Sequence, residues 1–316
     1  MTTIIDERKC NYVSSRGILK SCAIHSMMPK SSCAYDVAHL IKYIIYDKQN
    51  SNTSIYVCSE ALSYFVNKIL PYITKTFILV SGDSDLIIPY EALSQQDFKK
   101  LLSCPLLLVW YAQNNITNDH FIKLKTIPIG LDYHTICSST TESLSLSNLN
   151  GHQWGQKMHP LKQETQLLDI RNKAPLFKSR KPLIYSNMHF NLDRWNSRKT
   201  AIENIPTDLM VLQNKYMTRD ETWKKMSEYQ FIISPYGNGY DCHRTWEAIL
   251  LGCIPIVYGT VFNTLFNGLP VLQVNDWKDI TADLLHQTAN KYQHIIDIIP
   301  AKLILQYWIQ KIKNCK

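Results

Sequence analysis

The chain has 316 residues, of which 45% are hydrophobic and 19% charged. This composition excludes an intrinsically disordered chain, which would combine low hydrophobicity with high net charge. At roughly 150 residues per domain, the length predicts about two domains. The formal net charge is +8, but the chain has no basic block of roughly five to eight residues. We therefore expect no nucleic-acid partner; the mild basic excess suits a small phosphate-bearing ligand.

The nine cysteines are spread along the chain, and no pair has the CxxC spacing of a metal or redox site. This pattern favours a reducing compartment. No apolar segment typical of a signal peptide follows the charged stretch Asp6–Lys9. The longest apolar run, Leu101–Ala112, is shorter than the about 20 residues of a membrane span. We expect a cytoplasmic protein without a transmembrane segment or a zinc site.

Strands and helices alternate through the first part of the chain. Helical periodicity predicts a helix over 34–46 and another over 61–69. Short apolar runs predict strands over 54–58, 76–80, 106–110 and 126–129. We further expect a helix over 95–102 and a short helix just before the last of these strands. Continuous apolar strands are covered on both faces, which indicates a parallel sheet in an α/β unit.

The alternation weakens between 132 and 180, and the Ser-, Thr- and Asn-rich stretch 138–150 predicts a surface connection. It then resumes in a second α/β unit. Strands are predicted over 182–185, 231–233, 254–257 and 270–274, and helices over 198–204, 222–228 and 243–251, followed by two C-terminal helical segments. The predicted fold class is α/β, with two Rossmann-like domains facing each other across a cleft.

The most informative stretch runs from Ser234 to Glu247, where a strand leads into a loop with two glycines and then into a helix. Gly237 and Gly239 would permit positive φ and close backbone approach. A helix N-terminus favours phosphate, and His243 and Arg244 in its first turn add donors. Glu247 lies on the same helix face and could accept hydrogen bonds from ribose hydroxyls. The alternative is a plain turn followed by a surface pair between Glu247 and Arg244.

The segment 239–259, with His-Arg-Thr-Trp-Glu-Ala and then Gly-Cys-Ile-Pro-Ile-Val, resembles the donor-nucleotide motif of GT-B glycosyltransferases. It is most similar to exostosin-like enzymes and more distantly to α1,3-fucosyltransferases. The segment 127–132, Ile-Pro-Ile-Gly-Leu-Asp, resembles the motif that ends the N-terminal domain of such enzymes. The resemblance implies that Glu247 holds ribose, that Arg244 holds phosphate, and that no metal or other cofactor is required.

On this basis the chain divides into four parts. We predict an acceptor-side domain over 1–135, a connecting segment over 136–180 and a nucleotide-sugar-binding domain over 181–285. C-terminal helices over 286–316 could pack back on the first domain. The nucleotide-sugar-binding domain would make most of the contacts with the donor.

Two carboxylates, Asp83 and Asp85, follow a predicted strand and are the catalytic candidates. Ligands bind beyond the carboxyl ends of strands in open α/β sheets. One of the two could be the general base that deprotonates an acceptor hydroxyl. Two alternatives stay open: a capped turn, or the DxD metal motif of a metal-dependent transferase.

Other polar residues complete the predicted site. Asn187 and Arg198 could reach the donor phosphates, and Tyr258 could stack on the base. Asn114 and Asp132 are expected on the acceptor side. The full set assigned to donor binding is Asn187, Arg198, Ser234, Gly237, Asn238, Gly239, Asp241, His243, Arg244, Glu247 and Tyr258.

The sequence thus predicts a glycosyltransferase that moves a sugar from a nucleotide diphosphate sugar to a hydroxyl of a glycan or another acceptor. Such an enzyme without a membrane anchor suits a virus or bacterium that builds glycans in the cytosol. The alternatives are a nucleotide-sugar-binding protein without activity and the metal-dependent transferase. Neither the donor sugar and base nor the stereochemical outcome follows from the residues.

Overall fold

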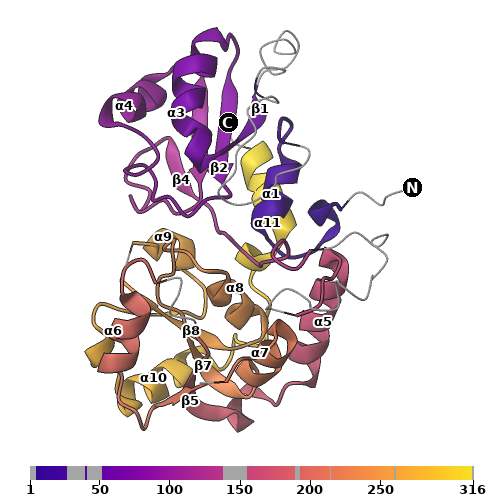
Figure 1. Cartoon of the computed structure of the whole chain (residues 1–316), viewed down its shortest axis with the longest axis vertical. Coiled ribbons are helices and arrows are strands. Elements are labelled where there is room, and N and C mark those ends of the chain that lie inside the picture. The colour runs from indigo at the N-terminus through magenta and orange to yellow at the C-terminus, as the bar shows by residue number, and fades with distance from the viewer. Residues whose placement is uncertain are drawn as a thin grey trace.

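The structure is a computed structural model that describes residues 5–26, 40, 52–137, 155–188, 193–213, 215–259 and 261–314. Two α/β units, each built on a parallel sheet, lie one above the other in Figure 1. The predicted fold class, two such units facing across a cleft, is confirmed. The predicted surface connection over 138–150 and, apart from residue 40, the predicted helix over 34–46 lie outside the described residues.

The first unit contains a four-stranded sheet whose strand order follows the chain, β1-β2-β3-β4. Its parallel strands are β1 (Thr53–Cys58), β2 (Phe77–Gly82), β3 (Leu107–Ala112) and β4 (Leu124–Thr126). Every residue of β2 is buried, as expected for a strand covered on both faces. The helical elements of this unit are α1 (Ser15–Ser21), α3 (Leu62–Tyr64) with the helical turn Phe65–Ile69, and α4 (Gln95–Ser103).

The prediction around β4 was wrong in two respects. No helix precedes the strand: the described residues 113–123 form turns, with Asn118 and Asp119 at φ of 50° and 59°. The Asp119 carboxylate accepts hydrogen bonds from the backbone and side chain of Thr126, which favours a turn over a helix. The strand also ends at Thr126 rather than at 129, just before Pro128, which has no backbone donor.

The second unit contains a five-stranded parallel sheet of order β6-β5-β7-β8-β9. Its strands are β5 (Lys181–Ser186), β6 (Met210–Leu212), β7 (Tyr229–Ile233), β8 (Ile254–Tyr258) and β9 (Leu272–Val274). The chain goes outward from β5 to β6 and then returns past β5 to β7. The order therefore reverses between β5 and β7, and such a switch point is where open α/β sheets bind ligands.

The helices of the second half are α5 (Pro160–Lys173), α6 (Ser197–Asn204), α7 (Arg219–Met226), α8 (His243–Leu250), α9 (Asn263–Phe266), α10 (Ala282–Tyr292) and α11 (Leu305–Lys313). Helix α5 and strand β6 were not predicted. Helix α5 buries Leu167 and Ile170, but most of its other residues are polar, so its periodicity in the sequence is weak.

The two units share one apolar core in addition to their own. It joins Ile18 and Leu19 of α1 and Trp308 of α11 to Leu167 of α5 and Trp246 of α8. Helix α11, at the end of the chain, packs on α1 of the first unit (Figure 1). In the part of the chain that the structure describes, no helix is both long and apolar enough to span a membrane, and the cysteines are free thiols.

Hydrogen bonds between distant segments hold this junction. The backbone N–H of Val13 donates to the carbonyl of Leu303 (2.8 Å), and that of Leu305 donates to Asn11 (2.9 Å). Buried Glu164 of α5 accepts hydrogen bonds from the backbone of Asn11 (2.9 Å) and from the Tyr133 hydroxyl (2.7 Å). Both ends of the chain and α5 are therefore fixed to one another.

The packing of α11 gives a first testable prediction. Trp308 is 1% exposed, and its Nε1 donates to the carbonyl of Lys302 (2.8 Å). Trp308→Ala should lower the free energy of unfolding by about 3–5 kcal/mol, measured by urea denaturation. The control, Ile298→Ala, removes a side chain that is 64% exposed and should change it by less than about 0.5 kcal/mol. Equal losses in both variants would contradict the role of α11 in the shared core.

Candidate active site

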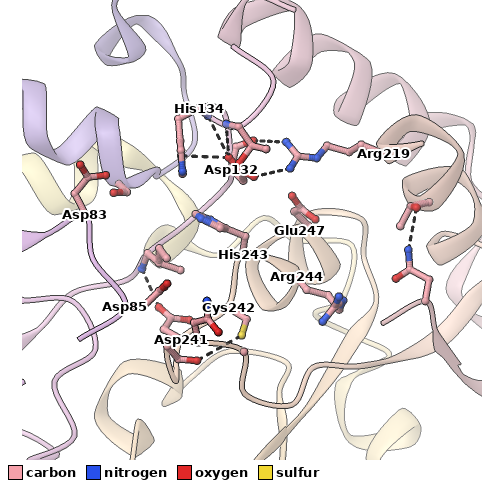
Figure 2. A pocket seen from close by; sticks show the side chains of 18 of the residues that line it. Asp83, Asp85, Asp132, His134, Arg219, Asp241, Cys242, His243, Arg244 and Glu247 are labelled. Atoms are coloured by element: carbon pink, nitrogen blue, oxygen red, sulfur yellow. Dashed lines mark hydrogen bonds and ion pairs between the residues drawn. The ribbon is translucent and has the colours of Figure 1, made fainter. Parts of the chain in front are cut away.

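A pocket of about 310 Å³ lies between the two units, at the carboxyl ends of the strands of both sheets. We call it the central pocket. The loop after β2 and the chain after β4 form one wall; the loops after β5 and β7 and helices α6, α7 and α8 form the other. Figure 2 shows Asp83 and Asp85 on one side, Arg244 and Glu247 on the other, and His243 between them. The pocket includes the switch point between β5 and β7.

Most of the predicted site residues line this pocket. They are Asp83, Asp85, Asp132, Asn187, Arg198, Gly237, Asn238, Gly239, Asp241, His243, Arg244 and Glu247. Three others do not: Asn114, Ser234 and Tyr258. The sequence therefore identified residues between Asp83 and Glu247 that the fold brings together around one pocket. Their roles stay predictions.

The glycines of the loop after β7 permit close approach. A Cβ on Gly237 would lie 2.8 Å from an Arg198 nitrogen, and one on Gly239 would lie 2.9 Å from the Asn114 amide nitrogen. Neither glycine has a positive φ, so that part of the prediction was wrong. The loop needs glycine because neighbouring side chains occupy the space of a Cβ.

Asn114 lies behind the wall of the pocket. It is 1% exposed, and its Oδ1 accepts from the backbone N–H of Asp241 (2.9 Å) while its Nδ2 donates to the carbonyl of Ser84 (3.2 Å). Both ends of the amide are thus used within the protein. Asn114 joins the loop after β2 to the loop after β7. The predicted position of Asn114 on the acceptor side of the pocket was therefore wrong.

Asp241 lines the pocket and also joins the two units. Its carboxylate accepts from the backbone N–H of Ile129 (2.8 Å) and from Nε1 of Trp246 (2.9 Å). Burial raises its pKa to about 6, against the hydrogen bonds that favour the charged form. Its hydrogen bonds fix the start of α8 against the first unit.

Ser234 and Tyr258 lie outside the central pocket. The Ser234 hydroxyl shares a hydrogen bond with that of Thr245 (2.9 Å), which ties β7 to α8. Tyr258, 37% exposed, lines a neighbouring aromatic cavity of about 430 Å³. The aromatic side chains of that cavity are Trp195, Tyr236, Tyr240, Tyr258 and Trp277. It adjoins the central pocket, because Tyr236 and Tyr240 flank the loop whose residues 237–239 line the latter.

The second unit gives the pocket a cationic wall. Burial lowers the pKa of Arg244 to about 10, and nearby Arg198 acts in the same direction. Because this pKa is still well above 7, the guanidinium is charged at neutral pH. Within the described residues Arg244 has no hydrogen bond or ion pair. Glu247 is 9% exposed, which excludes the alternative of an exposed Glu247–Arg244 pair. An unpaired, mostly buried guanidinium beside a helix N-terminus is suited to an anionic ligand.

The first unit gives the pocket its carboxylates. Asp83 is 4% exposed, and its Oδ1 lies 3.2 Å from Nε of Arg16. Burial raises the pKa of Asp83 to about 6, although Arg16 and His243 act in the opposite direction. Burial also raises the pKa of Asp85, opposed by His243 and a hydrogen bond from Asn238. Both carboxylates therefore hold a proton more readily than an exposed aspartate does.

Sequence reasoning missed Arg16 and Arg219. Arg16 stands in the first turn of α1, where the helix dipole disfavours a cation. A basic residue at the second position after the serine N-cap, Ser14, was the available signal that an anion lies nearby. Arg219 opens α7, and its guanidinium forms an ion pair with the Asp132 carboxylate and donates to the Asp132 carbonyl (2.7 Å).

Asp132, His134 and His243 form a cluster at the junction of the units. Burial alone would raise the pKa of Asp132, but Arg219 and His134 hold it well below the usual value. Burial lowers the pKa of His134 to about 4 despite Asp132, so this imidazole is neutral at pH 7. His243 Nδ1 lies 2.7 Å from the carbonyl of Gly130 and therefore donates to it when the ring is neutral.

The possible ligand atoms of this cluster lie within 4.8 Å of one another. Protein groups already engage the carboxylate: Arg219 contacts one oxygen, and the backbone N–H groups of His134 and Thr135 donate to the other. A divalent cation would have to displace these donors. The donor set therefore fits a hydrogen-bonded junction better than a metal site.

Comparisons with known proteins add little. No protein-family model matches the chain, and no curated protein is significantly similar to it. Among solved structures, the crystal structure of HepE from Anabaena in complex with UDP is similar at 11% identity and a TM-score of 0.40. The match covers 88% of this chain and 78% of HepE. A likeness at this score supports no conclusion about the ligand, and the exostosin-like and fucosyltransferase resemblance stays a prediction.

The Asp132–Arg219 pair yields a stability prediction. Arg219→Met should lower the free energy of unfolding by about 3–5 kcal/mol, because it leaves a buried carboxylate without its cation. Adding Asp132→Asn should recover part of this loss, since the uncompensated charge is then gone. Denaturant unfolding of both single variants and the double variant at pH 7 measures the coupling.

The same pair predicts a pH dependence. The pKa of Asp132 is lower in the folded state than in the unfolded chain, so its contribution is present above about pH 4 and lost as the pH falls. If the Arg219→Met/Asp132→Asn double variant were no more stable than Arg219→Met alone, the assignment of Asp132 and Arg219 as a buried ion pair would be contradicted.

Proposed function

We propose that the protein is a metal-independent glycosyltransferase that moves a sugar from a nucleotide diphosphate sugar to a hydroxyl acceptor. The observation that supports this best is the division of charge across one pocket. Arg244, which has no ion pair among the described residues, stands at a helix N-terminus and faces carboxylates of the other unit that have raised pKa values. Transfer from a diphosphate leaving group needs both, a cation for the leaving group and a base for the acceptor.

On the donor side, the N-terminus of α8 and the side chains of Arg244 and Arg198 would hold the diphosphate. The negative charge on the leaving group grows as the bond to the sugar breaks. Cations fixed in a largely buried wall stabilise that charge without reorganisation. Glu247, which lines the same wall, has a carboxylate that can accept hydrogen bonds from ribose hydroxyls.

The nucleobase would enter the aromatic cavity that adjoins the loop 237–239. Tyr236 and Tyr240 stack there with ring centroids 4.1 Å apart, and Tyr258 meets Tyr236 edge to face at 5.9 Å. A flat aromatic base fits such a surface by stacking. The predicted role of Tyr258 is thus kept, with its place in this cavity rather than in the central pocket.

On the acceptor side, Asp83 or Asp85 would take the proton of the attacking hydroxyl. The ion pair of Asp83 with Arg16 argues against the DxD metal alternative, because a cation would compete with a guanidinium that is already in place. The other alternative, a binding protein without activity, predicts donor binding without turnover. The glycan or other acceptor and the cytoplasmic location stay predictions.

Donor binding can be tested by thermal denaturation with UDP-, GDP- and CDP-sugars, each with EDTA or with Mn²⁺. We expect one nucleotide class to stabilise the protein regardless of EDTA, by about 2.7 kcal/mol at 100 times the dissociation constant. Arg244→Ala should abolish the effect. Arg8→Ala, which removes an exposed cation paired with Asp6 outside the pocket, is the matched control and should retain it.

Each other result has a definite meaning. Stabilisation that requires Mn²⁺ would favour the metal-dependent alternative. Stabilisation without release of the nucleotide in a turnover assay would favour the binding protein. The absence of any shift with all three sugar classes would overturn the proposal.

A further inference from the structure

Arg16 is a buried cation behind the acceptor-side wall. It is 4% exposed and does not line the central pocket. It lies in the first turn of α1, directly after Ser15, and the Ser14 side chain caps the helix by accepting from the backbone N–H of Gly17. A cation at this end of a helix is opposed by the dipole, so its burial requires an anionic partner.

That partner is Asp83. The guanidinium Nε lies 3.2 Å from the carboxylate, and the Ser15 side chain also bonds to Asp83. The backbone of Asp83 is fixed from the other side, because its N–H donates to Oε1 of Gln113 (2.9 Å) and its φ is 55°. A non-glycine residue rarely adopts this φ without support. Asp83 is therefore held by α1 and by the residue that follows β3, with its side chain at the pocket (Figure 2).

The position of α1 depends in turn on the end of the chain. A Cβ on Gly17 would lie 3.0 Å from a methyl group of Leu305, the first residue of α11. Ile18 and Leu19 share a core with Trp308 and Ile312. Helix α11 thus fixes α1, and α1 places Arg16 against Asp83.

We propose that Arg16 is a positioning residue that holds Asp83 ionised at the pocket, so that Asp83 rather than Asp85 is the base of the transfer. This inference rests on the proposed function. The acceptor O–H bond breaks and its proton goes to the Asp83 carboxylate. The acceptor oxygen forms a bond to the anomeric carbon, while the bond from that carbon to the diphosphate breaks and its electron pair leaves with the nucleotide. One such displacement inverts the anomeric centre.

Several groups act on Asp83 besides Arg16. Glu7 and the ionisable side chains of Tyr56 and Cys58 lie on the side of the first unit, and His243 reaches it from α8. Burial raises the pKa of Asp83 to about 6 even with Arg16 in place. Without Arg16 that pKa rises further, and less of the base is ionised at neutral pH.

The test is the pH profile of kcat/KM for hydrolysis of the stabilising nucleotide sugar, with water as the acceptor. We expect the acidic limb of the wild type near pH 6. In Arg16→Met it should move up by about one unit or more, so that activity at pH 6 falls by at least about fivefold and recovers at high pH. Arg16→Lys, which keeps the charge, should move it less. Leu101→Ala, which truncates a fully buried side chain of α4 without changing a charge, is the control for a general loss of stability.

A second measurement does not need turnover. The pKa of Asp83 is higher in the folded state than in the unfolded chain, so its contribution to stability falls as the pH rises from about 4 to 6. The difference between the wild type and Asp83→Asn isolates this term. The same difference measured in the Arg16→Met background should extend the fall to higher pH.

The outcomes separate the two proposals. An acidic limb that stays in place in Arg16→Met, or that moves equally in Leu101→Ala, overturns the role of Arg16. An unmoved limb in Asp83→Asn overturns the choice of Asp83 over Asp85. A wild type that turns over no nucleotide sugar overturns the proposed function. If the pH dependence of stability still shifts in Arg16→Met in that case, the ion pair of Arg16 with Asp83 is confirmed but its role in catalysis is not.

Discussion

The site depends on hydrogen bonds that the loop after β7 makes with the first unit. The Asp241 carboxylate accepts from the backbone of Ile129, the Asp241 N–H donates to Asn114, and His243 contacts the carbonyl of Gly130. These contacts are buried or partly buried, and leaving a buried polar group unpaired would cost about 1–3 kcal/mol. They hold the N-terminus of α8 against the first unit, and the pocket is the space left between the fixed loops.

Charge is separated within that space. Arg244 and the buried Arg198 lie on the wall of the second unit. Asp83 and Asp85 lie on the wall of the first, across the pocket from Arg244 (Figure 2). Arg219 and Asp132 neutralise each other at the junction, so they contribute little net charge to a ligand. A ligand with an anionic end and a hydroxyl-bearing end would meet the appropriate group on each wall. The proposed reaction follows from this arrangement, since its two charged groups need opposite environments.

Much of the architecture was accessible from the sequence. Apolar runs separated by amphipathic segments predicted most strands of both sheets, because a buried parallel strand must be apolar on both faces. The Gly237–Glu247 stretch and the carboxylates after β2 were identified because the carboxyl ends of parallel strands gather at one edge. Helix α5 was missed since most of its residues are polar, and the turns before β4 were missed since Asn118 and Asp119 outweigh helix propensity there.

The sequence by itself determined which residue types stand at the ends of strands and at the start of α8. Only the tertiary structure decided which distant side chains complete the site. Arg16 meets Asp83, Arg219 meets Asp132, and Asn114 and Tyr258 lie outside the central pocket. The local pattern of residue types indicates the burial and secondary structure of one segment at a time. Ion pairs and shared walls depend on how segments far apart in the chain are packed, and that is set by the core common to both units.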